Sequence, residues 1–207
     1  MSGEADRLEK LERRLAHLED REAIRDVIYR YCRAVDRADV ELLKSCYWPD
    51  GFDDHGFYGG NAHEFAEFVG PLLRVTMSTT HSCSNPIIEI EGDKAYCETQ
   101  VDVLHRIVEG DEFINEWAQC RYFDIFEKRD GVWRIAVRTY AGDGTFWFKM
   151  KAQVATHRTR SFEASVSRGA RHPEDPVYRL RTIRDTVQVR EPAKDFWGTL
   201  HSLGDHF

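Results

Sequence analysis

The sequence has no run of apolar residues approaching the roughly 18 that a membrane-spanning helix needs, and no basic-then-apolar signal segment opens it. Its net charge is −7, so it has no broad basic excess with which to meet phosphates. The basic cluster between residues 157 and 171 is only local. These absences predict a protein that neither crosses a membrane nor is secreted, and they argue against a nucleic-acid partner.

Paired cysteine motifs are also absent. The five cysteines are odd in number and form no Cys-x-x-Cys motif, and their spacings offer no clustered zinc ligands. Reduced thiols in a cytoplasmic protein are the simplest interpretation. The sequence contains neither a Gly-rich phosphate loop nor a dinucleotide fingerprint, so we expect no cofactor.

What is present is typical of a soluble globular protein. The 207 residues are 42% apolar and 31% charged, and this length allows one domain with a sizeable core and an extension. We expect the domain to cover residues 1–149. Residues 150–207 are richer in Arg, Pro and His and show little periodicity, which indicates an extension that wraps the domain or a neighbouring subunit, with one short helix around residues 192–203.

The beginning of the chain is predicted to be helical. Residues 6–36 carry an apolar stripe that starts with four leucines spaced three and four apart, as in a coiled-coil seam: Leu8, Leu11, Leu15 and Leu18. Residues 40–47 predict a short helix, and Asn61 is a candidate N-cap for another. The seam is too short for a free coiled coil, so it predicts packing on the protein's own domain or on a partner. We expect a homo-oligomer, a dimer or a trimer.

The second part of the chain is rich in strands. Strands are predicted at residues 86–91, 95–105, 113–127 and 132–140, with Gly-containing turns between them, and residues 52–60 are predicted to be a loop. Period-two alternation places His105 on the inward face of its strand. In the last strand, Trp133, Ile135 and Val137 alternate with Arg134, Ala136 and Arg138. Helices followed by an antiparallel meander predict an α+β fold, with helices packed on one face of a strongly curved sheet around a conical apolar pocket.

Four segments carry a family resemblance. They are Arg21–Asp26, Tyr31–Asp36, Thr80-His81, and residues 126–133 with their Lys-Arg-Asp-Gly-Val-Trp hairpin. Over residues 8–148 the chain resembles the SnoaL-like branch of the nuclear transport factor 2 superfamily, whose fold is a cone-shaped α+β barrel. It is most similar to cofactor-independent lyases of that branch: scytalone dehydratase, the bile-acid 7α-dehydratase and hexachlorocyclohexane dehydrochlorinase.

The resemblance implies a catalytic Asp–His dyad formed by Asp36 and His81. A carboxylate beside an imidazole fixes the ring tautomer and stabilises the imidazolium that forms when the ring takes up a proton. Tyr31 matches a functional tyrosine of the bile-acid enzyme, and His105 matches a second catalytic histidine of scytalone dehydratase. His55 stands where both dehydratases place a pocket tyrosine. An arginine that the bile-acid enzyme carries near its last strand has no counterpart in the local sequence, so that enzyme's substrate is not carried over.

These residues predict a lyase that acts by acid–base elimination. His81 would be the base, and His105, His55 or Tyr31 would be the acid partner. Aromatic candidates for a hydrophobic, hydroxylated substrate such as a steroid or a lignin-derived phenylpropanoid are Trp48, Phe52, Phe57, Tyr58 and Trp117. Loss of water and loss of formaldehyde both fit these groups.

Two other uses of the same residues stay open. One is a non-catalytic small-molecule-binding module with the same cone, because fold alone does not give function. In such a module Asp36 and His81 need not meet. The other is a metal site built from Asp36 and the three histidines, although no short-range ligand spacing supports it and we expect no metal.

Overall fold

The computed structural model describes residues 2–151 and 169–182. Its helices are α1 (Ser2–Arg37), α2 (Val40–Ser45), α3 (Ala62–Val75) and the 3-10 helix η1 (Pro176–Thr182). Its strands are β1 (Tyr47–Asp54), β2 (Gly59–Asn61), β3 (Ser78–Glu91), β4 (Lys94–Glu109), β5 (Glu112–Arg129) and β6 (Val132–Lys151). No helix among these residues is long and apolar enough to cross a membrane.

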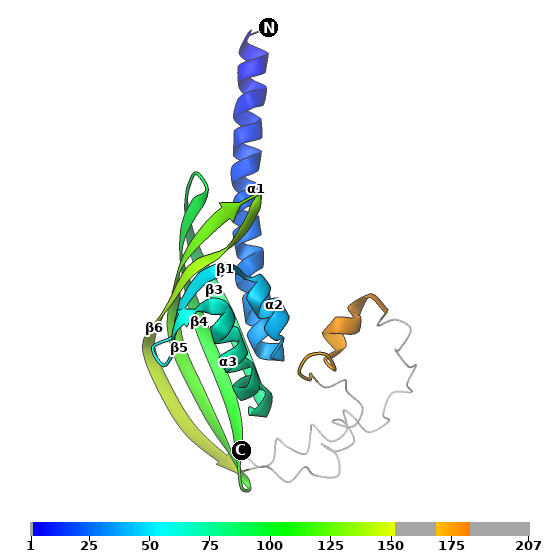
Figure 1. Cartoon of the computed structure of the whole chain (residues 1–207), viewed down its shortest axis with the longest axis vertical. Helices are drawn as coiled ribbons and strands as arrows, with labels where there is room; N and C mark the ends of the chain where they lie inside the picture. Colours follow the sequence, from blue (N-terminus) through cyan, green and yellow to red (C-terminus); the bar gives the residue numbers. More distant parts are fainter. Residues whose placement is uncertain (1, 152–168, 183–207) are drawn as a thin grey trace, which may run out of the picture.

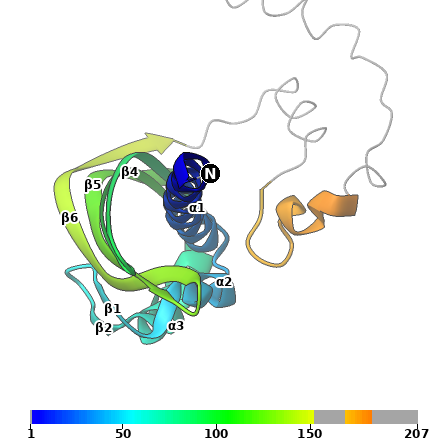
Figure 2. The same ribbon diagram turned by 90° about the horizontal axis from the view of Figure 1, so that it is seen from above.

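The six strands form one curved sheet in the order β2-β1-β6-β5-β4-β3. The sheet wraps around α1 and α3, and these helices lie on its concave side (Figures 1 and 2). All neighbouring strands are antiparallel except β1 and β6, which are parallel. The predicted α+β architecture is therefore confirmed, with two corrections: the sheet contains one parallel pair, and it is open rather than closed into a barrel.

Helix α1 has two different halves. Its second half buries Ile24, Val27, Ile28 and Tyr31 against the sheet, as the apolar stripe predicted. Its first half stands clear of the sheet (Figure 1). The predicted N-cap of α3 is confirmed, because the side chain of Asn61 accepts hydrogen bonds from the first turn of that helix.

Strand β1 corrects the loop expected at residues 52–60, because residues 52–54 belong to the strand. Residues 48–51 carry a turn signal, but in the structure they form an irregularity inside β1, where the pairing with β6 shifts between Tyr47 and Phe52. A side chain at Gly51 would come within 2.9 Å of the carbonyl oxygen of Trp48. Pro and Gly therefore mark a bulge here rather than a chain reversal. As a result, Asp53 belongs to a strand, and His55 follows directly after it.

Strand β3 begins at Ser78, earlier than the predicted start at Pro86. Its pairing with β4 shifts between Ser84 and Ile87, and Asn85 in between has a φ of 51°. This bulge interrupts the alternation of apolar and polar residues along the strand. The part before the bulge is mostly polar, so its sequence carries no period-two signal. The strand assignment places His81 in register with β4, on the concave side of the sheet.

Two further bulges change the inward face of β6. The register with β5 shifts between Ile125 and Phe126 and again between Gln119 and Cys120. Trp133 and Ile135 are buried, but after the first bulge it is Arg138 that is fully buried. Strict alternation would place Val137 on the same face as Trp133 and Ile135, but one extra residue in a strand exchanges its two faces.

The described part of the predicted extension packs against its own domain. The backbone N–H of His172 donates to the carbonyl of Arg37, Arg74 donates to the carbonyl of His172 at 3.1 Å, and the side chains of Arg37 and Asp175 form an ion pair at 3.1 Å. This segment therefore rests on the ends of α1 and α3. The helix predicted around residues 192–203 lies outside the described residues.

Candidate active site

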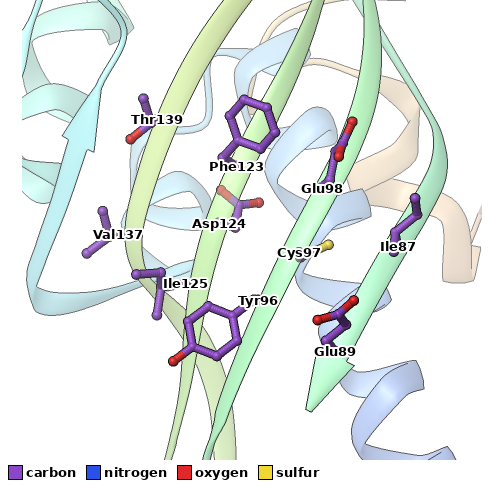
Figure 3. A pocket seen from close by; sticks show the side chains of 10 residues that line it. All are labelled: Ile87, Glu89, Tyr96, Cys97, Glu98, Phe123, Asp124, Ile125, Val137 and Thr139. Atoms are coloured by element: carbon purple, nitrogen blue, oxygen red, sulfur yellow. The ribbon is translucent and has the colours of Figure 1, made fainter. Parts of the chain in front are cut away.

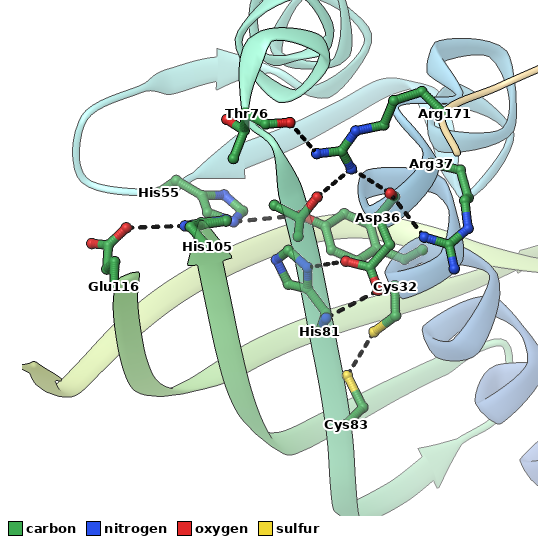
Figure 4. A network of polar contacts seen from close by, with 12 residues as sticks. Cys32, Asp36, Arg37, His55, Thr76, His81, Cys83, His105, Glu116 and Arg171 are labelled. Atoms are coloured by element: carbon green, nitrogen blue, oxygen red, sulfur yellow. Dashed lines mark hydrogen bonds and ion pairs between the residues drawn. The ribbon is translucent and has the colours of Figure 1, made fainter. Parts of the chain in front are cut away.

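The predicted contact between Asp36 and His81 is present (Figure 4). Asp36 lies in the last turn of α1, and His81 lies in β3 on the strand that contacts this helix. One carboxylate oxygen of Asp36 is 2.7 Å from His81 Nδ1, and the other accepts the backbone N–H of His81 at 3.0 Å. Two contacts to one residue hold the carboxylate in one orientation. The imidazole is therefore fixed with Nδ1 toward Asp36, and Nε2 makes no hydrogen bond within residues 2–151 and 169–182.

Burial sets the charge state of His81. Its side chain is only 8% exposed, and that of Asp36 is 14% exposed. Desolvation lowers the pKa of His81 below its usual 6.5, although the Asp36 carboxylate acts to raise it. The positive forms of His105 and His55 lower this pKa further. The neutral imidazole therefore predominates near neutral pH, and a neutral imidazole is a competent base.

Arg171, in the described part of the extension, contacts the backbone of Asp36. Arg171 donates to the backbone carbonyl of Asp36 and to the hydroxyl of Thr79, and it donates to the carbonyl of Thr76 at 2.7 Å (Figure 4). Burial lowers the pKa of this guanidinium, and Asp36 opposes that shift. Arg171 thus ties the end of α1 to the start of β3, the two elements that carry the dyad. No local pattern points to this residue, because it lies 135 positions after Asp36 in an aperiodic segment.

His105 lies on the inward face of β4, as predicted. Its ring centroid is 5.8 Å from that of His81, and its Nδ1 is 3.0 Å from the carboxylate of Glu116 on β5. The register pairs His105 with Glu116 across the sheet. Both side chains are about one quarter exposed, so they lie nearer to solvent than the dyad does.

His55 belongs to a second carboxylate–imidazole pair. Its Nδ1 contacts Asp53, which is fully buried and also accepts the hydroxyl of Tyr47. Its Nε2 is 3.4 Å from the hydroxyl of Tyr31. The His55 ring stacks on Phe65 at 4.7 Å. His55 is therefore held on both sides, and it joins His81 and His105 as a third imidazole that contacts a carboxylate.

A buried ion pair lies beneath Tyr31. Arg138 makes two hydrogen bonds of 2.7 Å to Asp124, and both side chains are fully buried. The guanidinium lies 3.9 Å from the ring centroid of Tyr31 and 4.1 Å from that of Tyr122. Burial raises the pKa of Tyr31 far above its usual 10, so its hydroxyl stays protonated. Tyr31 is thus a fixed hydroxyl between the Arg138 pair and His55.

The five predicted aromatic contact residues fall into two groups. Tyr58 is half-buried and, like exposed Phe57, packs against Phe65, the residue on which His55 stacks. Trp48 lies between Arg129 and Arg134 and donates to the carbonyl of Glu127, away from the dyad. Phe52 is exposed. Trp117 lies on the outer face of the sheet, where its indole N–H donates to the carboxylate of Asp102 at 3.2 Å. Of the five, only Phe57 and Tyr58 adjoin the cluster around His55.

A surface hollow of about 360 Å³ lies away from these groups. It is formed by β3, β4, β5 and β6, and outward-facing side chains such as Tyr96, Phe123 and Ile125 line it (Figure 3). None of the predicted catalytic residues contributes to it. This hollow is therefore on the side of the sheet opposite to the two Asp–His pairs.

No group of three or more His, Cys, Asp or Glu side chains within residues 2–151 and 169–182 is arranged to hold a metal ion. The three site histidines each face a carboxylate of their own: Asp53, Asp36 and Glu116. In this part of the chain the donor atoms are arranged as three separate pairs rather than as one coordination shell.

Sequence reasoning missed Asp53, Glu116, Arg138 and Arg171. Asp53 and His55 are two residues apart, which puts them on one side of an extended chain, but this signal needs residues 47–54 to be recognised as a strand. Glu116 follows from the pairing of β4 with β5. Arg138 depends on the bulge in β6, and no local pattern predicts that bulge.

Comparisons with known proteins identify the family and the fold. The SnoaL-like domain family matches residues 16–139, and no curated protein matches the sequence. A type 2 hexachlorocyclohexane dehydrochlorinase superposes with a TM-score of 0.59 at 25% identity, covering 68% of this chain and 94% of its own. A candidate scytalone dehydratase from Novosphingobium aromaticivorans superposes at 0.58 and 20% identity, covering 66% and 93%. The match over residues 16–139 spans more than half of the sequence, and the chain belongs to the SnoaL-like domain family.

Proposed function

We propose that this protein is a cofactor-independent lyase in which Asp36 and His81 act as the general base. The observation that carries the proposal is the double contact of the Asp36 carboxylate with the ring and the backbone N–H of His81. A non-catalytic binding module has no need of this arrangement, in which a desolvated, uncharged imidazole directs Nδ1 at the carboxylate and Nε2 makes no hydrogen bond to the described residues. Family neighbours include enzymes named for eliminations, which supports the lyase class in general terms.

In the proposed reaction His81 Nε2 takes a proton from the substrate. The imidazolium that forms is stabilised by Asp36, whose carboxylate already faces Nδ1. Burial makes this stabilisation stronger than it would be in water, because the effective dielectric constant is lower. Arg171 keeps Asp36 in place through its backbone carbonyl.

We assign the acid role to His55 rather than to His105. Asp53, the partner of His55, is fully buried, whereas His105 and Glu116 are both about one quarter exposed. A fully buried carboxylate interacts more strongly with the imidazole beside it, because less water screens the interaction. Tyr31 stays protonated and lies next to His55 Nε2, so it can pass or share the proton.

Two elimination reactions can be written with these groups so that atoms and electrons balance. In a dehydration, His81 removes a proton from carbon, the electron pair forms a double bond, and the neighbouring hydroxyl takes a proton from the acid and leaves as water. In a deformylation, His81 removes the proton of a primary hydroxyl, the carbon–carbon bond breaks, and formaldehyde leaves. The electron pair then passes to the adjacent carbon, which takes a proton from the acid. Neither reaction needs an external oxidant or a reductant.

The surroundings of His55 favour a hydrophobic substrate that carries a ring and hydroxyl groups. Phe57, Phe65 and Tyr140 surround its imidazole with aromatic surface, and His55 stacks on Tyr140 at 5.7 Å. Aromatic walls with a few convergent polar groups are typical of small-molecule sites. Steroid-like alcohols and lignin-derived phenylpropanoid diols both have this chemistry.

Product analysis tests the proposed function. The purified protein is incubated with a panel of hydroxylated steroids and diaryl-propanoid diols, and the products are measured by mass spectrometry. Loss of one water from a compound identifies a dehydratase, and loss of one formaldehyde identifies a deformylating lyase. Ligands that bind without being converted, together with an inactive panel, would instead favour the binding module.

The rate should depend on pH through His81. The pKa of this residue lies below 6.5, so we expect kcat/KM to fall about tenfold per pH unit once His81 becomes protonated, at a pH below 6.5. Asp36 raises this pKa, so Asp36→Asn should move the fall to still lower pH, besides reducing the rate. Measuring kcat/KM from about pH 4 to 8 checks both directions. A fall centred above 6.5 in the wild type would contradict the assignment.

The acid assignment predicts unequal effects of two matched carboxamide changes. Asp53→Asn should lower kcat about 10²-fold, because His55 loses the buried carboxylate that contacts its Nδ1. Glu116→Gln, the same change beside His105, should lower kcat less than about tenfold, since that pair is more exposed. Steady-state kinetics, with thermal melting as a check on folding, measure the difference. Equal losses, or a larger loss for Glu116→Gln, would move the acid role to His105.

A further inference from the structure

The first half of α1 is an unpartnered helix within the described structure. Residues 3–19 are exposed to solvent, and this part of the helix projects beyond the sheet (Figure 1). Its four leucines, Leu8, Leu11, Leu15 and Leu18, are 49–61% exposed. Four aligned leucines on a projecting helix form an apolar stripe, and such stripes mark interaction surfaces.

The stripe has the spacing of a two-heptad coiled coil. With Leu8 and Leu15 at a positions, Leu11 and Leu18 fall at d positions. The residues that flank this seam are then fixed by the sequence: Arg7 and Arg14 at g, and Glu12 and Glu19 at e. Every g position of these heptads is basic, and every e position is acidic.

We infer that residues 7–19 form a parallel coiled coil with the same residues of another copy of this chain. In a parallel pair, each g residue faces the e residue of the following heptad on the partner helix. Arg7 therefore meets the partner's Glu12, and Arg14 meets the partner's Glu19. In an antiparallel pair, g faces g and e faces e, so Arg would face Arg and Glu would face Glu. The charges thus favour pairing with a second copy of this chain, with the two helices parallel.

Among residues 2–151 and 169–182, no part of the protein's own domain covers this seam. Arg21 and Asp20 anchor the next turn of α1 to the sheet, through the carbonyl of Ile88 at 2.7 Å and the indole of Trp133 at 2.7 Å. The next two a positions, Glu22 and Tyr29, are exposed, so the a side of the helix points away from the sheet. A second helix can therefore lie along this side, with the symmetry axis roughly parallel to α1.

Charge exchange in the full-length chain tests the pairing. Arg7→Glu with Arg14→Glu makes both flanks acidic and should raise the dissociation constant of self-association by at least about tenfold. Adding Glu12→Arg and Glu19→Arg to the same chain restores opposite charges across a parallel seam and should restore association. The matched control is Lys10→Glu with Arg13→Glu, which changes the net charge equally at c and f positions. Sedimentation equilibrium measures all four proteins.

A cysteine placed in the seam tests the direction and the register. Leu8→Cys meets itself in a parallel, in-register pair, so mild oxidation with glutathione disulfide should join two chains covalently, whereas Lys10→Cys should react far less. A wild-type protein that sediments as a single 24.1 kDa chain at micromolar concentration overturns the inference. So does equal weakening by the flank and control charge changes, or equal cross-linking of the two cysteine variants.

Discussion

His81→Ala is expected to remove most of the turnover, a loss of about 10²–10⁴-fold in kcat, while the protein stays folded. The substitution removes the proposed base. It leaves the backbone N–H of residue 81 in place, so the Asp36 carboxylate keeps its 3.0 Å hydrogen bond to the main chain. Steady-state kinetics on the substrate found by product analysis and thermal melting measure the two effects. His17→Ala, on the exposed part of α1, serves as the control and should have no effect on the rate.

Asp36→Asn should produce a comparable loss. The amide keeps the shape of the side chain but lacks the charge that stabilises the imidazolium. Combining both substitutions should cost scarcely more than one alone, because residues that act as a unit are not additive. If His81→Ala turns over like the wild type, proton abstraction belongs to another residue, and His55 is the next candidate. If turnover stops with a chelator and returns with Zn²⁺ or Fe²⁺, the histidines are ligands and the dyad assignment is wrong.

Arg138→Met is expected to have the largest effect on stability, with a loss of about 3–5 kcal/mol in the free energy of unfolding. It leaves the Asp124 carboxylate fully buried without its partner, and it removes the cation from between Tyr31 and Tyr122. Urea unfolding monitored by circular dichroism measures the change. Adding Asp124→Leu should recover a large part of the loss, since a buried pair can be replaced by apolar residues at little cost.

The control for this prediction is an exposed ion pair on the same sheet. Arg121 pairs with Asp143 at 3.0 Å, and their side chains are 38% and 46% exposed. Arg121→Met should therefore cost no more than about 1 kcal/mol. Similar losses for Arg121→Met and Arg138→Met would show that the buried pair does not support the inner face of the sheet.

The elements that the sequence predicted well are those with an uninterrupted local pattern. The hairpins β4–β5 and β5–β6 turn at Gly110 and Gly131, which have φ values of 63° and 79°, a conformation that glycine adopts without strain. Within β4 the alternation is unbroken, so the inward face of His105 could be predicted. The stripe of α1 and the cap at Asn61 are equally local signals. Periodicity and turn chemistry suffice for such segments because each residue's environment depends on its near neighbours.

The predicted contact between Asp36 and His81 had a different source. Nothing local joins residues that lie on a helix and on a strand 45 positions apart. The resemblance to SnoaL-like lyases supplied the pairing, and the fold then explained it, because α1 packs on β3. The catalytic role of the pair stays a prediction that the substitutions above test.

The sequence by itself determined the fold class, the long hairpins, the core side of α1 and the leucine seam. Tertiary structure decided the second Asp–His pair, the burial of Arg138 and the contact of Arg171 with Asp36. Asp53 enters the site because residues 47–54 form a strand despite their Pro and Gly, and Arg138 enters it because a bulge exchanges the faces of β6. Bulges and long-range contacts arise from how whole strands fit together around the helices, so they leave no periodic trace in the residues that take part.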